Sequence, residues 1–167
     1  MGNVAVEEFN ALPAREAESA LLSCCASRRW ALAVAGRRPY GSVDELRSAA
    51  AFELAALEWA DIEEALGAHP RIGERAKGGG REASWSRDEQ SGVDGEARAA
   101  LIEGNRRYEE RFGHVFLICA TGLGAGEMLA ALEKRLAGDD AEAERIVVRV
   151  ELGKIVRLRL DKLLERG

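Results

Sequence analysis

The chain has 167 residues, of which 47% are apolar and 32% charged, and it carries a net charge of -5 with a pI near 5.3. A chain of this length forms one domain by default and buries about 70% of the surface that its unfolded form exposes. The acidic balance lacks the basic footprint of a nucleic-acid-binding protein, so we expect no nucleic-acid partner. We therefore expect a single globular domain over residues 1–167.

The cysteines and the N-terminus bear on compartment and metal binding. Cys24, Cys25 and Cys119 are odd in number and form no C-x-x-C spacing. This pattern fits a reducing cytoplasm and argues against a disulfide scaffold or a zinc site. Residues 1–10 lack the basic region and apolar run of a signal peptide. We expect a cytoplasmic protein with no metal and with cysteines that pack as small apolar residues.

Helical signals dominate the first half of the chain, which is rich in Ala, Leu, Glu and Arg. Residues 16–35 predict one or two helices that end at Gly36. Ser42, with Glu45 three residues later, has the pattern of a capping box and predicts a new helix start. From there a helical region, with breaks allowed, extends to about Leu66.

The second half opens with a segment of a different kind. Residues 67–85 have no helical period and contain three consecutive glycines, and a loop of this length in a compact domain is commonly functional. The apolar run at 115–132 contains polar residues and glycines, so a buried helix explains it better than a membrane span. Further helices are predicted over residues 86–90, 94–112, 115–136 (interrupted near 122–126) and 141–166. The prediction is an all-α, single-domain multi-helix bundle with a long loop between its two halves.

His69 is the first candidate for chemistry. Pro70 pushes His69 out of the α region and fixes the following φ angle, so the imidazole is presented from a defined, non-helical backbone. Histidine titrates near neutrality and suits proton transfer. Taken alone, His69 is more simply a loop or helix-end histidine without a catalytic role.

Ser86 and Glu89 allow two interpretations. Ser-x-x-Glu is a capping box, in which Glu89 bonds back to the Ser86 backbone N–H. Alternatively, Glu89 stands at a helix start beside the loop that carries His69, where a carboxylate orients the imidazole and stabilises its charged form. The two interpretations compete for the same carboxylate.

Arg157 and Arg159 lie about 200° apart around the predicted terminal helix. One of them can therefore point inward while the other points to solvent. An inward arginine can hold a carboxylate through two parallel hydrogen bonds. The alternative is a pair of solvated arginines or a structural ion pair.

Four motifs in this order form a specific set, although each alone is weak. They are HPRIG at 69–73, S-x-x-EQ at 86–90, RFG-x-x-F at 111–116 and E-L-x-K-I-x-x-L-R-L at 151–160. Together they resemble the 2-oxo-4-hydroxy-4-carboxy-5-ureidoimidazoline (OHCU) decarboxylases, which convert an unstable urate derivative to (S)-allantoin. The resemblance covers nearly the whole chain.

The resemblance implies an all-helical decarboxylase, commonly a homodimer, with no metal or organic cofactor and a small ureidoimidazoline as substrate. It implies that His69 is catalytic and that Glu89 is its acid/base partner. The residues that it implies for substrate binding are Pro70, Ser86, Gln90, Ile118, Ala120 and Arg159. Arg157 replaces Arg159 if the register of the last helix is shifted. Two other functions stay open: a lyase or hydrolase acting on a related ring ureide, and a helical interaction module without activity.

Overall fold

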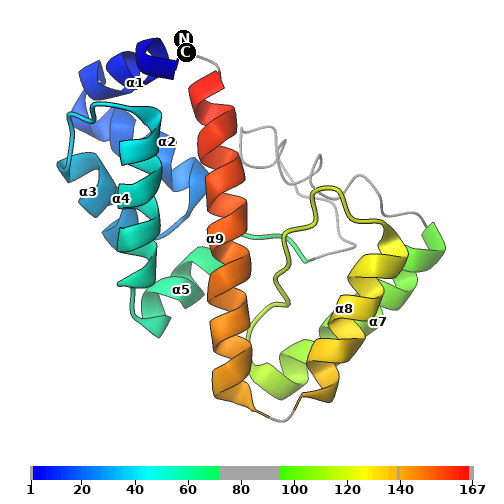
Figure 1. Ribbon diagram of the computed structural model, residues 1–167. Coiled ribbons are helices and arrows are strands. Elements are labelled where there is room, and N and C mark those ends of the chain that lie inside the picture. The colour runs from blue at the N-terminus through cyan, green and yellow to red at the C-terminus, as the bar shows by residue number, and fades with distance from the viewer. Residues whose placement is uncertain (1, 72–94, 139, 166–167) are drawn as a thin grey trace. The chain divides into compact units, whose positions relative to one another are not determined.

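A computed structural model of the protein describes residues 2–71, 95–138 and 140–165, with side chains from residues 5 and 98 onward in the first two ranges. Within these ranges the chain forms α-helices and no strands (Figure 1). The helices are α1 (Gly2–Ala11), α2 (Ala14–Cys24), α3 (Arg28–Gly36), α4 (Val43–Ala55), α5 (Trp59–Leu66), α7 (Gly95–Phe112), α8 (Ala125–Ala137) and α9 (Ala141–Glu165). The all-α prediction is confirmed, while the helix predicted at 86–90 lies outside the described residues.

The helices divide between two compact units. One unit comprises Met1–Ala65 with Gly153–Gly167, and the other comprises Leu66–Leu152. Helix α9 is continuous and contributes its first half to the second unit and its last half to the first. The single domain expected over residues 1–167 stays a prediction.

Serine caps and a buried tryptophan organise the first unit. The Ser42 hydroxyl accepts a hydrogen bond from the Glu45 N–H at 3.1 Å, so the predicted helix start is confirmed. The Glu45 carboxylate bonds back to the Gly41 N–H at 2.7 Å, one residue earlier than an ideal capping box requires. Trp30 on α3 is fully buried and donates its indole N–H to the Ala50 carbonyl of α4 at 2.9 Å. This bond ties the two helices together and satisfies the polar atom of the tryptophan.

Two arginines tie helix ends together in the same unit. Arg38 donates to the carbonyls of Phe9 and Leu12, at the end of α1, at 3.0 and 2.8 Å. Carbonyls at a helix end have no partner within the helix, and a guanidinium supplies one. On α4, Arg47 donates two bonds to Asp161 at 2.9 and 2.7 Å, which fixes the last half of α9 within this unit.

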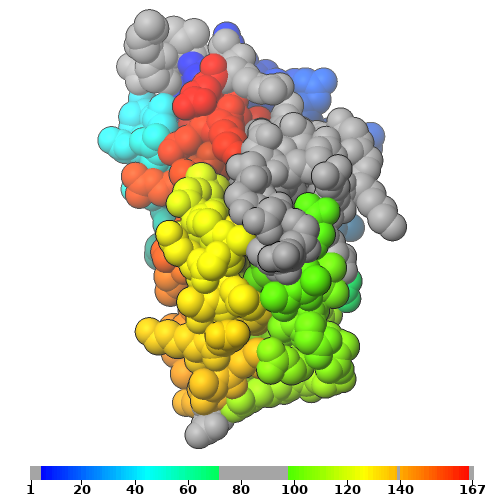
Figure 2. All heavy atoms as spheres, turned by 90° about the vertical axis from the view of Figure 1, so that its right-hand side faces the viewer, coloured from blue at the N-terminus to red at the C-terminus, as the bar shows by residue number. Residues whose placement is uncertain are grey.

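In the second unit, α7 and α8 pack side by side (Figures 1 and 2). They come very close at Gly104, where a Cβ atom would lie 2.3 Å from the Leu132 side chain. Glycine therefore allows this approach of the two helices. The core around them contains Leu101, Tyr108, Phe116, Ile118, Ala120, Met128 and Leu132.

The helix predicted from residue 115 is wrong in its first part. Gly113, at a φ of 80°, ends α7, and its N–H bonds to the Glu109 carbonyl at 2.9 Å. A left-handed residue at this position terminates a helix, and glycine adopts that conformation without a steric penalty. Residues 115–124 then run without helical structure until α8 begins. Phe116, Leu117 and Ile118 are buried, which accounts for the apolar run in the sequence. A short apolar run does not by itself distinguish a helix from an extended chain.

None of the described helices is long and apolar enough to cross a membrane.

Candidate active site

His69 and Pro70 follow directly on the end of α5. The His69 N–H bonds to the Leu66 carbonyl at 3.0 Å, which closes the last turn, and Pro70 prevents the helix from continuing. Both residues are half-buried. The sequence interpretation, a histidine held on a non-helical backbone by the proline after it, agrees with this geometry.

The next residue, Arg71, anchors this segment to α7. Its guanidinium forms two bonds with the Glu109 carboxylate, from Nε at 2.7 Å and from Nη2 at 2.9 Å. Paired bonds between a planar guanidinium and a carboxylate fix orientation as well as distance. The chain just after His69 is therefore held to a helix of its own unit.

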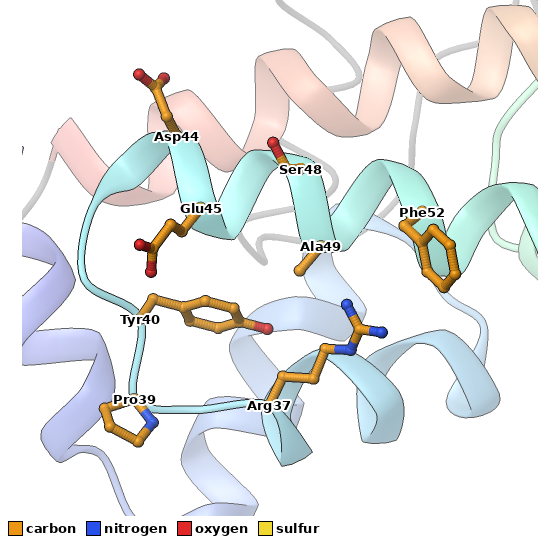
Figure 3. A pocket seen from close by; sticks show the side chains of 8 residues that line it. All are labelled: Arg37, Pro39, Tyr40, Asp44, Glu45, Ser48, Ala49 and Phe52. Carbon is orange, nitrogen blue, oxygen red and sulfur yellow. The ribbon is translucent and has the colours of Figure 1, made fainter.

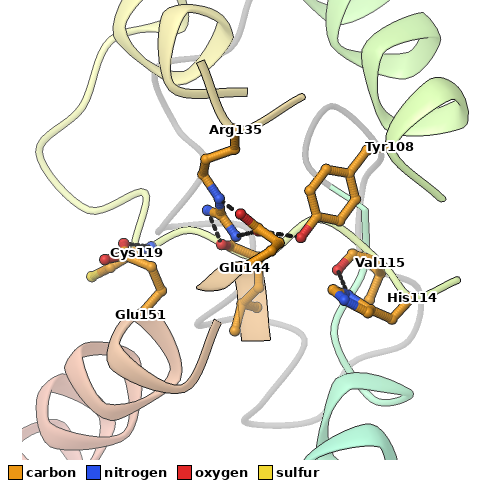
Figure 4. Close-up of polar contacts among 8 residues, drawn as sticks. Tyr108, His114, Val115, Cys119, Arg135, Glu144 and Glu151 are labelled. Atoms are coloured by element: carbon orange, nitrogen blue, oxygen red, sulfur yellow. Dashed lines mark hydrogen bonds and ion pairs between the residues drawn. The ribbon is translucent and has the colours of Figure 1, made fainter. Parts of the chain in front are cut away.

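A buried polar cluster joins α7, α8 and the start of α9 (Figure 4). Arg135 donates to Glu144 from Nε at 2.8 Å and from Nη2 at 2.5 Å, and the Tyr108 hydroxyl donates to the same carboxylate. Arg135 also lies over the rings of Tyr108 and Phe116. Burial and the Glu144 carboxylate raise the pKa of Tyr108 well above its ordinary value, so its hydroxyl keeps its proton. Each buried charge thus has a partner, as buried charges require.

The same region fixes the backbone of residues 117–120. Arg135 donates to the Leu117 carbonyl at 2.6 Å, and Glu151 accepts from the Cys119 N–H at 3.0 Å (Figure 4). Ile118 and Ala120, expected to contact substrate, are both buried here. Two charged side chains from helices therefore stand in for the regular hydrogen bonds that this segment lacks.

Arg159 lies in the other unit, on the last half of α9. It is only 1% exposed, whereas Arg157 is exposed. The inward arginine of the two is therefore Arg159, to which the resemblance assigns substrate binding; that role stays a prediction. A fully buried guanidinium costs considerable desolvation unless its donors are engaged, so this position is not that of a solvated surface arginine.

The predicted site residues that the structure describes are divided between the two units. His69, Pro70, Ile118 and Ala120 belong to the second unit, and Arg159 belongs to the first. Ser86, Glu89 and Gln90 lie outside the described residues, so both interpretations of Glu89 stay predictions.

The residues that sequence reasoning missed are Arg135, Glu144 and Glu151. Arg135 and Glu144 are nine positions apart and sit on different helices, so no local spacing marks them as a pair. Glu151 opens the last motif of the sequence, but its contact with Cys119 spans 32 positions. The signal that could have identified these residues is a charged side chain on the buried face of a helix.

A hollow on the surface of the first unit has none of the predicted site residues in its lining (Figure 3). It is lined by Arg37, Pro39, Tyr40, Asp44, Glu45, Ser48, Ala49 and Phe52. Its main polar groups are engaged within the protein: Tyr40 donates to the Val34 carbonyl at 2.5 Å, and Arg37 pairs with Glu53 at 3.3 Å. We assign no ligand to it.

In the part of the chain that the structure describes, no group of three or more His, Cys, Asp or Glu side chains is placed to hold a metal ion. Cys24 and Cys25 are fully buried, as expected of small apolar residues, whereas Cys119 is half-buried.

The chain is similar to known proteins over most of its length. The family model described as OHCU decarboxylase matches residues 10–161. A protein from Arabidopsis thaliana named uric acid degradation bifunctional protein TTL is 32% identical over 146 residues, which are 84% of this chain and 45% of that protein. A protein from Amia calva named 2-oxo-4-hydroxy-4-carboxy-5-ureidoimidazoline decarboxylase is 29% identical over 140 residues, covering 81% of this chain and 79% of the other. This chain thus spans less than half the length of the plant relative.

Solved structures show the same fold. An OHCU decarboxylase crystallised in the presence of (S)-allantoin superposes with a TM-score of 0.75 at 29% identity, covering 86% of this chain and 96% of the other. An (S)-allantoin synthase superposes with a TM-score of 0.69 at 19% identity, covering 95% and 53% of the two chains, and this likeness concerns the fold alone. With a family match that spans residues 10–161, this chain belongs to the OHCU decarboxylase family.

Proposed function

We propose that this protein removes carbon dioxide from 2-oxo-4-hydroxy-4-carboxy-5-ureidoimidazoline and releases (S)-allantoin. The observation that carries the proposal is the similarity, across nearly all of both chains, to an OHCU decarboxylase crystallised with (S)-allantoin. The match to the family over residues 10–161 supports it.

The substrate itself accepts the electron pair that is released when its carboxylate leaves. It carries a carboxylate and a hydroxyl on one ring carbon, next to a C=N bond. When the bond to the carboxylate breaks, its electron pair moves into the C=N group, and carbon dioxide leaves. The ring nitrogen takes up one proton, the hydroxyl gives up its proton to form the ring carbonyl, and the former imine carbon takes up another, so one proton is consumed overall. Orientation, charge stabilisation and proton transfer are the contributions left to the enzyme.

We assign these contributions to the residues predicted from the sequence. His69 and Glu89 move the protons, and Arg159 holds the substrate carboxylate. Pro70, Ser86, Gln90, Ile118 and Ala120 contact the rest of the ring and the ureido arm. The support from the structure is the non-helical presentation of His69 and the inward position of Arg159, which is 1% exposed.

The proposal includes a reaction without metal or organic cofactor, a homodimeric assembly and a place in the cytoplasm. The cofactor-free reaction follows from the substrate, whose own C=N group accepts the electrons that pyridoxal or thiamine accept in many other decarboxylases. The other two features come from the resemblance and the cysteine pattern.

The experiment that tests this function generates the substrate in situ from urate and follows the product by circular dichroism. We expect a signal from one enantiomer, formed faster than in buffer. A racemic product that forms at the rate of the buffer alone would contradict the proposal and would favour a helical module without activity. Consumption of a different ring ureide under the same conditions would favour the related lyase or hydrolase.

A further inference from the structure

Ile118 lies between two backbone groups that charged side chains hold in place. On one side, Arg135 donates to the Leu117 carbonyl at 2.6 Å. On the other, the Cys119 N–H donates to Glu151 Oε1 at 3.0 Å. Glu151 is 9% exposed, and the Arg135 side chain is 11% exposed, so water screens neither contact strongly.

The peptide groups of Ile118 itself are left without such partners. Among the residues that the structure describes, neither its N–H nor its C=O forms a hydrogen bond. In a trans peptide, the C=O of one residue and the N–H of the next point in opposite directions. With the groups of Leu117 and Cys119 turned toward α8 and α9, those of Ile118 are turned away from these helices.

We infer that Glu151 is a positioning residue for decarboxylation: by holding the Cys119 N–H, it directs the N–H and C=O of Ile118 toward the ureide groups of the substrate. This inference rests on the proposed function. A ureide carries N–H groups next to a C=O, so it can bond to the backbone donor and the backbone acceptor of one residue. Buried backbone groups without a partner are costly, and a ligand that supplies both bonds removes that cost.

Arg135 has the same effect at Leu117, but its side chain is also the partner of Glu144 and lies over two aromatic rings. Replacing Arg135 would therefore disturb the core of the unit. Glu151 is the cleaner position for a test, because a conservative variant exists. Glu151→Gln keeps an oxygen acceptor, while Glu151→Leu has a similar size and no acceptor.

The test compares wild type, Glu151→Gln and Glu151→Leu, with Glu142→Gln as the matched control. Glu142 is an exposed carboxylate on the same helix and has no part in the proposed site. Three quantities are measured: KM and kcat, the Kd for (S)-allantoin by calorimetry, and the hydrogen-exchange rate of the amides of residues 117–120. For Glu151→Leu we expect KM and Kd to rise about tenfold, the effect of losing one well-formed hydrogen bond, with a smaller change in kcat. The Cys119 amide should also exchange faster. Glu151→Gln and Glu142→Gln should stay within about twofold of wild type.

Two results would overturn the inference. One is a Glu151→Leu variant with unchanged KM and unchanged affinity for (S)-allantoin. The other is a Glu151→Gln variant as impaired as Glu151→Leu, because the carboxylate charge would then be the essential feature. If Glu151→Leu does not fold, Glu151→Asp takes its place, since its shorter side chain keeps the charge and shortens the reach to Cys119. Turnover by the wild type tests the proposed function separately, so an active wild type with an equally active Glu151→Leu contradicts the positioning role alone.

Discussion

Arg71 and Glu109 form a two-bond ion pair that ties the segment after His69 to α7, with both N–O distances under 3 Å at 2.7 and 2.9 Å. Both side chains are partly exposed, at 50% and 26%. An ion pair in this position adds at most about 1 kcal/mol to stability. Its value to the protein therefore lies in the orientation of the histidine segment.

Glu109→Gln should separate these two effects. We expect the free energy of unfolding to change by less than about 1 kcal/mol, while kcat falls about tenfold because the histidine segment loses its fixed orientation. Urea unfolding and the circular-dichroism assay measure the two quantities. The control is Glu110→Gln, which removes an exposed ion pair with Arg106 at 2.5 Å on the same helix. Equal losses of activity in both variants would show that the tether to His69 is irrelevant.

Arg159→Ala should weaken substrate capture and raise KM, because the buried guanidinium is the proposed partner of the substrate carboxylate. Arg159→Lys should rescue it only partly, since lysine lacks the planar pair of donors. Arg157 is exposed, so Arg157→Ala should change stability by no more than about 0.5 kcal/mol and leave KM near wild type. Steady-state kinetics of the three variants measure the KM values that test this prediction. A reversal of the two alanine phenotypes would move the carboxylate site to Arg157.

His69→Asn should lower the rate about 10²–10⁴-fold, because asparagine is similar in size but cannot transfer a proton near neutrality. Its product should drift toward racemic allantoin as the uncatalysed reaction, open to protonation from either face, takes over. Glu89→Gln should lose activity if the carboxylate acts on the histidine, and keep it if Glu89 only caps a helix. The ratio of enantiomers at the end of the reaction is the readout. Full enantiomeric purity at full rate in His69→Asn would refute the mechanism.

The stability of the protein should fall at high pH in a way that depends on Tyr40. Burial, opposed by the nearby Arg37 charge, raises the pKa of Tyr40 to about 12 from its ordinary 10.0. The folded state therefore holds the phenol proton more tightly than the unfolded state does. The contribution of Tyr40 to the free energy of unfolding is complete below pH 10 and is lost as the pH rises toward 12. Above pH 10, Tyr40→Phe should lose stability less steeply than wild type, by at most about 1.4 kcal/mol per pH unit. Urea unfolding between pH 8 and 11 measures the slopes, and parallel slopes would contradict the assignment.

Chelators should leave turnover unchanged, because the reaction proposed here uses no metal. The measurement is the rate before and after prolonged dialysis against EDTA, with the urate-oxidising step that supplies the substrate assayed separately. A loss of turnover that a divalent ion restores would rule out the cofactor-free mechanism.

Local patterns predicted most of the helices well. The cap at Ser42, the helix that ends near Phe112 and the long terminal helix all depend on residues close in sequence, and the structure confirms each of them. The non-helical segment after Gly113 could not be predicted in this way. Two of its hydrogen bonds come from Arg135 and Glu151, which are distant in the chain, and its apolar residues fit a buried helix equally well.

Local patterns predicted less of the candidate site than of the fold. The inward position of Arg159 agrees with helical geometry, which allows only one of two arginines 200° apart to face a core. The roles of His69 and Glu89 came from the motif set as a whole, since each residue alone has a simpler structural explanation. Neither kind of reasoning pointed to Glu151, whose importance depends on a contact with a backbone amide.

The close approach of α7 and α8 at Gly104 also limits which substitutions the sequence can accept. A methyl group at position 104 would lie 2.3 Å from Leu132, which is fully buried and has little room to withdraw. Position 104 can therefore accept a side chain only when position 132 carries a residue smaller than leucine. A substitution at position 104 has to follow a smaller residue at position 132, and that first change leaves a destabilising cavity until the second one fills it.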